Sequence, residues 1–347
     1  MTRTVTRLLF LAPALLAACE GMMVGTVASG DNLAEFEAAW AWVDSLYPAF
    51  EAKGIDWDAV HSAFRPEAEA ARGDEIVQVL VDILAILSDS HTYFQTRGGG
   101  VVYPHLSPRL LRDRLAFDPH LLRRYFLEAL LVSEDGAFEY QVLDGNDLGY
   151  VRVTTFDPER MMDGFPAVME FVRGTPALII DVRNNNGGQS ENVAAVVGRF
   201  IDAPVQWMDA FEQDGVPFEP WPAIEPDDRY YRYANPVVIL INGASLSAGE
   251  LFPEVMKQLP AVTVVGETTA GGGCNDYHDT PGDLRLASGR LIHIPTACVE
   301  RYDGELVEWN GVPPDILVPM TIADVERGVD VQLEAAIELL KQEIEHP

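Results

Sequence analysis

The sequence is poor in positive charge, has only three cysteines, and contains no apolar run long enough to cross a bilayer as a stable helix. Lys and Arg number 24 against 54 Asp and Glu, which gives a formal net charge of −30. A surface of this sign repels phosphate backbones, so nucleic-acid binding is a poor hypothesis. Internal repeats and low-complexity segments are also absent, and the hydrophobic fraction of 48% excludes global disorder. The 347 residues suffice for one large domain or two ordinary ones.

The N-terminus has the features of an export signal. Two arginines precede a short apolar run at 8–16, and small residues then lead directly to Cys19. This arrangement resembles the bacterial lipoprotein signal, which implies cleavage before Cys19 and acylation of its thiol. We therefore expect a signal peptide at 1–18, a tether at 19–32, and a protein held by its lipid in a bacterial cell envelope, facing the periplasm or the exterior. The alternative is an ordinary signal peptide that happens to contain a cysteine.

The two remaining cysteines, Cys274 and Cys298, form an even pair once the first cysteine is acylated. In an oxidising compartment such a pair suggests a disulfide. Pro281, Gly282 and Gly289 lie between them and would let the two ends meet. Two separately buried thiols are the alternative.

Hydrophobic periodicity divides the mature chain into three regions. Residues 33–97 are expected to form a helical N-terminal domain, because apolar residues recur at three- and four-residue steps within 31–71 and 74–87. Residues 98–145 are a connecting region in which no clear module stands out. Residues 146–345 are expected to form the main domain.

The main domain alternates strand and helix patterns, which favours an α/β fold with a largely parallel sheet. Continuous apolar runs, typical of buried strands, occur at 177–182 and 237–241. A long surface loop is expected at 203–235. The expected elements are strands at 148–156, 177–182, 237–241 and 262–265, helices at 158–173, 190–201, 246–259 and 322–342, and a hairpin at 285–294.

A serine lies at a junction between a buried strand and a helix, in the segment NGASLSAGE (242–250). A serine at such a junction projects from a sharp turn beside free backbone N–H groups. Those groups can stabilise an oxyanion, at roughly 10²–10³ in rate per donor. Ser247, with Glu250 three residues later, also matches a capping box, which is the commoner meaning of this pattern in isolation.

Two further segments hold groups that such a serine would need. DVRNNNGG (181–188) follows a buried strand, and its Asn and Gly residues tolerate positive φ and let N–H groups converge on an anion. SDSHT (88–92) ends a helix and contains His91, a candidate general base. Each segment has a plain structural alternative. The first is also typical of a turn, and nothing but context separates His91 from His278 or His293.

Two more segments, VGETTAGGG (265–273) and EWNGVPPD (308–315), complete a series whose order resembles one serine peptidase family. This family comprises the tail-specific (C-terminal processing) proteases, the tricorn core protease and interphotoreceptor retinoid-binding protein. The resemblance runs from about Phe36 to Val318. It implies a ClpP/crotonase-like α/β core with a small helical N-terminal domain, and a hydrolase that needs no metal or cofactor.

Carried over by motif, the resemblance makes Ser247, rather than Ser245, the nucleophile. It also implies an oxyanion hole formed by the N–H of Ala248 together with that of Gly187 or Gly188.

The sequence departs from the Ser–Lys type of this family in two respects. The lysine expected in the loop after GETT is replaced by Gly272, and Lys257 falls on the helix that follows the serine. No PDZ module is recognisable between His91 and Leu148, so capture of a substrate C-terminus by such a module is not expected.

The tricorn-like branch of the family instead uses a histidine and a glutamate, which are His91 and Glu308 here. The resemblance implies that the imidazole transfers protons and that the carboxylate fixes its tautomer. Ser90 is expected to support the glutamate or the oxyanion region, and Glu305 is the alternative to Glu308.

These residues together predict hydrolysis of peptide bonds in a polypeptide or peptide substrate, through an acyl-enzyme and a Ser-His-Glu catalytic set. A non-catalytic binding protein for an apolar ligand or peptide is the alternative, because the retinoid-binding relatives use this scaffold for binding. A crotonase-type acyl-CoA enzyme is disfavoured, since an exported protein rarely meets CoA and the Ser–His pair would be idle.

Overall fold

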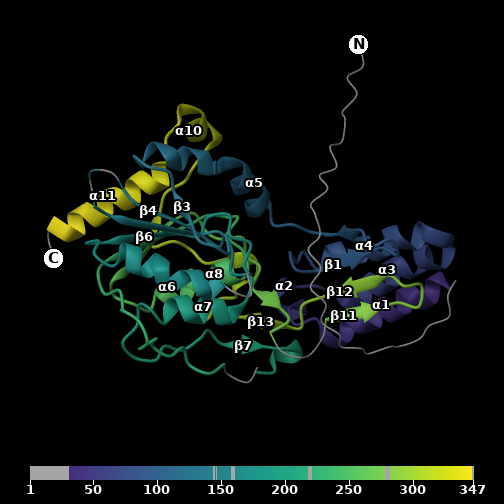
Figure 1. The fold of residues 1–347 in the computed structure, drawn as a ribbon. Helices are drawn as coiled ribbons and strands as arrows, with labels where there is room; N and C mark the ends of the chain where they lie inside the picture. Colours follow the sequence, from purple (N-terminus) through teal and green to yellow (C-terminus); the bar gives the residue numbers. More distant parts are fainter. Residues whose placement is uncertain are drawn as a thin grey trace, which may run out of the picture.

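The computed structural model describes residues 31–143, 145, 147–157, 161–217, 221–277 and 282–345. Within these ranges the chain forms a helical N-terminal lobe and a larger α/β lobe, and the helix α5 (Pro108–Ala116) lies where the chain passes between them (Figure 1). The predicted signal peptide, Cys19 and most of the predicted tether lie outside the described residues. In the described part, no helix has the length and apolar character needed to span a bilayer.

Four helices build the N-terminal lobe, and the first predicted helical stretch is broken into three of them. Tyr47, which precedes Pro48, ends α1 because a residue before proline disfavours the helical conformation. Gly54 ends α2 in the left-handed conformation, with φ of +63°. The helices are α1 (Asn32–Leu46), α2 (Phe50–Lys53), α3 (Trp57–Ala70) and α4 (Ile76–Ile86), with the 3-10 turn η1 (Gly73–Glu75) before α4.

A four-stranded antiparallel sheet completes the N-terminal lobe. Its order is β11 (Asp283–Arg285), β12 (Leu291–His293), β1 (Tyr93–Gln95) and β2 (Val101–Val102). The predicted hairpin is thus present as β11 and β12. It packs on the N-terminal helices, because Leu286, Ile292 and Ile294 belong to their apolar core. The region expected to be purely main domain therefore lends a hairpin to the other lobe, which local periodicity does not reveal.

A seven-stranded sheet forms the centre of the α/β lobe. The predicted strands appear as β5, β6, β8 and β9, and these run parallel to one another and to β14. β3 and β4 add an antiparallel edge. They come from the predicted connecting region, so part of it belongs to the core. The order is β14 (Ile316–Leu317), β9 (Val262–Gly266), β8 (Val237–Ile241), β6 (Leu178–Asp181), β5 (Gly149–Val153), β4 (Phe138–Val142) and β3 (Leu131–Val132).

Helices cover both faces of this sheet, which explains why its central strands are apolar on both sides. One face packs against α6 (Met161–Val172), α7 (Ser190–Val197) and α8 (Ala248–Met256), and the other against α11 (Val331–Glu345) (Figure 1). The prediction of one helix at 322–342 was wrong. Gly328, with φ of +74°, ends α10 (Ile322–Arg327) before α11 begins. The 3-10 helix η2 (Pro119–Arg124) contributes Leu121 and Leu122 to the interior.

A small third sheet carries the two cysteines, and two of its strands flank the β11–β12 hairpin in sequence. It consists of β10 (Cys274–Asn275), β13 (Ala297–Val299) and β7 (Ala210–Phe211). Cys274 and Cys298 are opposite each other in the register of β10 and β13, and a disulfide joins them. The predicted loop at 203–235 contains β7 and the 3-10 turn η3 (Gln213–Gly215).

Candidate active site

The candidate site lies at the carboxyl ends of parallel strands, where the loops after β6, β8 and β9 meet. Ligands of open α/β sheets bind at this edge. Two asparagines join the first two loops. The Asn184 N–H donates to Asn242 Oδ1 at 3.0 Å, and Asn242 Nδ2 donates to Asn184 Oδ1 at 2.9 Å.

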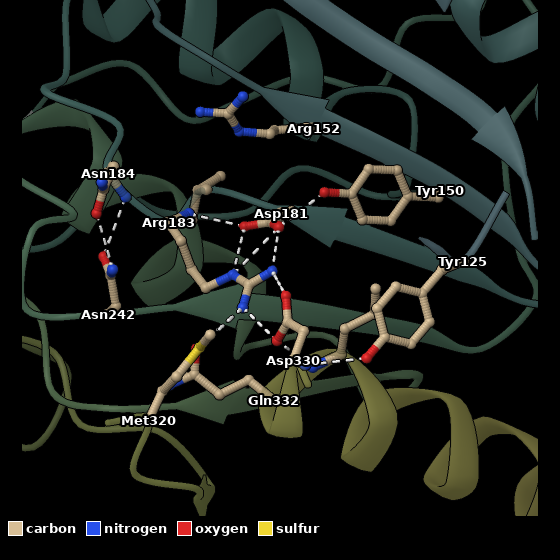
Figure 2. A network of polar contacts seen from close by, with 12 residues as sticks. Tyr125, Tyr150, Arg152, Asp181, Arg183, Asn184, Asn242, Met320, Asp330 and Gln332 are labelled. Atoms are coloured by element: carbon tan, nitrogen blue, oxygen red, sulfur yellow. Dashed lines mark hydrogen bonds and ion pairs between the residues drawn. The ribbon is translucent and has the colours of Figure 1, made fainter. Parts of the chain in front are cut away.

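A buried ionic network anchors the loop after β6 (Figure 2). The Arg183 guanidinium, which is fully buried, pairs with Asp181 at 2.6 Å and with Asp330 at 2.8 Å. Arg183 also donates to Gln332, and Tyr150 donates to Asp181 at 2.8 Å. Burial opposes ionisation of Asp181, but Arg183 outweighs it and holds the pKa of Asp181 below its ordinary value. Asp330 directly precedes α11, so the network ties the C-terminal helix to the site.

Ser247 occupies a strained turn at the start of α8, with φ of +58° and ψ of −125°. The Glu250 carboxylate accepts the Ser247 N–H at 3.0 Å, and the Glu250 N–H donates to the Ser247 carbonyl at 2.7 Å. Both bonds use the backbone of Ser247, not its hydroxyl. A serine with positive φ between a strand and a helix is the geometry of a nucleophile elbow.

The glycines of the loop after β6 lie directly against this turn. Gly187 has φ of +94°, and a Cβ added to it would lie 2.7 Å from Ser247 Cβ and 2.9 Å from Ala248 N. Only glycine therefore fits here without displacing the serine. The Gly187 N–H donates to Asn185 Oδ1 at 2.8 Å. Among the described residues, no hydrogen bond uses the N–H of Gly188 or Ala248. Of the three predicted oxyanion donors, these two amides are therefore the ones left available to a ligand.

Glu250 holds the serine turn and the loop after β9 together. Its carboxylate is fully buried and accepts four hydrogen bonds. The donors are the Ser247 N–H (3.0 Å), the Gly272 N–H (2.9 Å), the Gly271 N–H (2.8 Å) and the Thr269 hydroxyl (2.6 Å). Burial raises the pKa of Glu250, and the four donors oppose that rise.

His91 reaches the site from the N-terminal lobe, in the turn between α4 and β1. The Asp89 carboxylate shapes this turn by accepting the N–H groups of His91 at 2.8 Å and of Thr92 at 3.2 Å. Nδ1 of His91 is buried and has no hydrogen-bond partner among the described residues. Burial lowers the pKa of His91, although Asp89 opposes this effect, so the imidazole is neutral near pH 7.

The imidazole and the serine turn meet at Gly272. A Cβ added to Gly272 would lie 3.2 Å from His91 Cε1 and 3.5 Å from Glu250 Oε2. The same Glu250 oxygen accepts the Ser247 N–H. Residues more than 150 positions apart in the sequence therefore border one small region.

Glu308 lies behind this region, in a buried cluster with Lys53 and Asp89. The Lys53 ammonium is 2.8 Å from Glu308 Oε1 and 3.8 Å from Asp89 Oδ2. The other Glu308 oxygen accepts the Cys274 N–H at 3.2 Å. Burial and then the Asp89 carboxylate raise the pKa of Glu308 to about 8, whereas Lys53 lowers it. Among the described residues, no hydrogen bond joins Glu308 to His91.

The acidic residues near Cys274 do not form a thiolate metal site. Atoms of Asp89, Cys274 and Glu308 lie within 4.8 Å of one another. Cys274 is in the disulfide, so it offers no thiolate. The positive charge between the two carboxylates is the Lys53 ammonium.

The remaining predicted residues lie in less central positions. Glu305 is exposed, in contrast to the buried Glu308. The Ser90 hydroxyl accepts the Ser107 N–H at 3.1 Å. His293 pairs with Asp283. His278 lies outside the described residues, and Lys257 binds Pro313 and Asp315 at the far end of α8.

The helix α5 connects all of these loops. Asp113, which is buried, accepts the Gly243 N–H at 2.6 Å. Arg114 donates to Asn186, in the loop after β6. The further contacts are Arg112 to Glu267 (3.2 Å) and Arg109 to the carbonyl groups of Trp309 and Asn310. The segment in which no module was recognisable therefore contains the element that binds the site loops together.

A cavity of about 890 Å³ begins at the N-terminus of α7, beside the loop after β6. Its lining combines aromatic and acidic side chains. Among them are Trp207, Trp221, Tyr277, Glu191, Glu225 and Asp228.

Sequence reasoning missed Lys53, Tyr47 and Asp113, and it considered Glu250 only as a helix cap. Lys53 is one of only three lysines in the chain, but no local pattern relates it to a segment 255 residues away. Glu250 had a visible signal, because an acidic residue in an otherwise apolar segment must find partners when it is buried.

Two family models match this chain. The model described as peptidase family S41 matches residues 147–318, and the model described as the tricorn protease C1 domain matches residues 32–85. The first covers the five parallel strands of the large sheet and the loops around Ser247, and the second covers the helices before His91.

Individual relatives agree with these matches. The chain is 24% identical over 301 residues to the carboxy-terminal processing protease CtpB of Bacillus subtilis, a match that covers 81% of this chain and 58% of the relative. It is 32% identical over 202 residues to tricorn protease homolog 1 of Streptomyces coelicolor, covering 56% of this chain and 17% of the relative. The carboxy-terminal-processing protease of Bartonella bacilliformis is 24% identical, and 44% of its length is covered. This chain thus spans about half the length of such relatives, or less.

A solved structure from Parabacteroides merdae, proposed to be a peptidase, has the same fold over most of the chain. Its TM-score is 0.77 at 25% identity, and the match covers 90% of this chain and 97% of that one. The predicted α/β core with a helical N-terminal region is therefore confirmed.

Proposed function

Because this chain belongs to peptidase family S41, we propose that it is a serine peptidase with Ser247 as its nucleophile. In the proposed reaction the Ser247 hydroxyl attacks the carbonyl carbon of a peptide bond while His91 takes the hydroxyl proton. The tetrahedral oxyanion receives hydrogen bonds from the N–H groups of Ala248 and Gly188. His91 then protonates the leaving amine, and an acyl-enzyme on Ser247 remains. Water hydrolyses this acyl-enzyme with His91 again acting as the base.

One observation carries this proposal: the strained φ of Ser247, held by Glu250 against Gly187 and within the region that the His91 ring borders. A helix cap has no need of positive φ, whereas a nucleophile gains from the exposure that this conformation provides. The neutral state of His91 at pH 7 also favours its role as a base.

Glu308 is the proposed carboxylate of the set, and Glu305 is not, because Glu305 is exposed. The backbone of Cys274 links the two side chains. Its N–H donates to the Glu308 carboxylate, and a hydrogen bond with its backbone raises the pKa of His91. From this position its negative charge favours the imidazolium that forms when His91 accepts a proton. Ser90 is a neighbour that supports the His91 turn through Ser107.

The substrate is proposed to be a polypeptide or peptide. The cavity along α7 is suited to a substrate side chain, because it begins two residues beyond the oxyanion glycine Gly188. Its tryptophans and carboxylates favour an aromatic or basic side chain.

We also propose that Cys19 is acylated and that the protein acts as a lipoprotein of the bacterial cell envelope. The arginines, the apolar run and the small residues before Cys19 support this. Expression with radiolabelled palmitate should label the wild type but not Cys19→Ser. Equal labelling of the two would contradict the anchor.

The catalytic proposal is tested with a fluorophosphonate probe on purified protein. We expect wild-type protein to be labelled, Ser247→Ala to be unlabelled, and the matched variant Ser245→Ala to remain labelled. Ser245 lies in the same turn, but its hydroxyl donates to the Val182 carbonyl. Circular dichroism checks that all three proteins are folded. Labelling of Ser247→Ala at the wild-type rate would refute the proposal, and an unlabelled wild type would favour a binding protein on the same scaffold.

A further inference from the structure

Lys53 occupies a position that is costly for a lysine. It is the last residue of α2, and only 3% of its side chain is exposed. A buried ammonium costs several kcal/mol unless it is paired and hydrogen-bonded. The chain has only two other lysines, Lys257 and Lys341, and Lys341 is exposed. The burial of Lys53 therefore needs an explanation from its partners.

Those partners lead from Lys53 to the candidate site. Its ammonium donates to Glu308 Oε1 and to the hydroxyl of Tyr47, each at 2.8 Å. It also donates to the Leu87 carbonyl at 2.8 Å, just before the turn that carries His91. The Tyr47 hydroxyl in turn donates to Asp89 Oδ2 at 3.1 Å.

The ionisation of Glu308 in this cluster depends on the positive charge of Lys53. Asp89 and Glu308 are both buried and lie within 4.8 Å of each other, so the Asp89 charge opposes ionisation of Glu308. Tyr47 and Tyr277 also face Glu308, but neither supplies positive charge. Among the described residues, Lys53 is thus the one positive charge that lowers the pKa of Glu308.

We propose that Lys53 is a positioning residue of the peptidase site, whose ammonium favours the ionised form of Glu308 and holds this carboxylate in place so that it can stabilise protonated His91. This inference rests on the proposed function. It assigns to a residue of the N-terminal lobe a role in the chemistry of the α/β lobe. Lys53 itself does not touch the substrate; it acts through Glu308.

The sign of the pH effect follows from Glu308. Its pKa is raised to about 8, so the active ionised form is lost as pH falls through that value. Removal of the ammonium raises the pKa of Glu308 further, because burial and Asp89 are then opposed only by the Cys274 N–H. The acidic limb of the rate profile should therefore move to higher pH in Lys53→Met.

The experiment compares fluorophosphonate labelling rates from pH 5 to 10 for wild type, Lys53→Met, Lys53→Arg and the surface control Lys341→Met. We expect at least a tenfold lower rate at pH 7 and an alkaline shift of the acidic limb for Lys53→Met. Lys53→Arg should recover much of the rate because it restores the charge, and Lys341→Met should match the wild type. A folded Lys53→Met with the wild-type pH profile would overturn the inference, since a purely structural role leaves the profile unchanged.

A double-variant cycle separates this inference from the proposed function. If Lys53 acts through Glu308, then Lys53→Met/Glu308→Gln should be labelled as slowly as Glu308→Gln, and no slower. Additive losses would overturn the role of Lys53 while Ser247-dependent labelling of the wild type still stood. Should Lys53→Met fail to fold, the test is the comparison of the double variant, which loses one positive and one negative charge, with Glu308→Gln. Labelling of Ser247→Ala at the wild-type rate would instead defeat the proposed function and, with it, this inference.

Discussion

Removal of the Arg183 guanidinium should destabilise the protein more than loss of any surface charge. Arg183→Met removes the partner of two buried carboxylates, those of Asp181 and Asp330. Breaking a buried ion pair by removing one member costs about 3–5 kcal/mol, because an uncompensated charge remains. The matched control is Arg173→Met. Arg173 is half exposed and lies 3.4 Å from Glu170, and a pair of this kind contributes about 0–1 kcal/mol.

The pH dependence of this loss has a definite sign. In the wild type the pKa of Asp181 is held below its ordinary value, so its contribution is present above the unfolded-state value of 3.8 and is lost as pH falls through the folded value. In Arg183→Met the same buried carboxylate lacks the cation that it contacts and is left with only the more distant Arg152, so protonation lowers the cost of its burial. The stability difference between the two proteins should therefore be smaller at about pH 4.5 than at pH 7.

Urea unfolding followed by tryptophan fluorescence at both pH values measures this difference. A loss in Arg183→Met no larger than that in Arg173→Met would refute the reasoning about the buried network. If the difference in stability between wild type and Arg183→Met were larger at about pH 4.5 than at pH 7, the ion pair would not be its cause.

Three further changes test other contacts. Gly187→Ala should lower the labelling rate by about 100-fold, because the new Cβ would displace Ser247, and misplacement by about 1 Å costs that much; a wild-type rate would contradict the close approach. Glu250→Gln should lower both stability and the labelling rate, since one amide cannot accept all four hydrogen bonds, and labelling with thermal unfolding checks this. Cys298→Ser should lower the free energy of unfolding by roughly 3 kcal/mol, the loop-closure value for the 24-residue separation, and an unchanged urea midpoint would count against it.

Local patterns in the sequence predicted the parts of the fold that depend on local interactions. The apolar runs of β6 and β8 and the helix after Ser247 follow from burial on both faces of a sheet. The break at Gly328 was missed, because one glycine within a periodic stretch does not by itself end a helix. β3 and β4 were missed because their strand character depends on pairing, of β3 with β4 and of β4 with β5.

Only those residues of the candidate site that belong to a recognisable sequence motif could be predicted. Ser247 and Gly187 belong to segments whose turn chemistry can be recognised in a single sequence. Lys53 and Asp113 cannot be found in that way, because their partners, Glu308 and Gly243, lie 255 and 130 residues away. Such contacts depend on how the two lobes pack, which periodicity does not specify.

Because the candidate site is divided between two lobes, its activity should depend on how the lobes pack together. Ser247 and the proposed oxyanion donor Gly188 belong to loops of the parallel sheet, whereas His91 and Lys53 come from the N-terminal lobe. Neither lobe alone contains both the proposed nucleophile and its proposed base. Few apolar residues join α5 to the site loops. Its other contacts with these loops are hydrogen bonds and ion pairs. Any loosening of α5 or of the Lys53–Glu308 pair would therefore separate the imidazole from the serine before the central sheet unfolds, so activity should be lost before global structure.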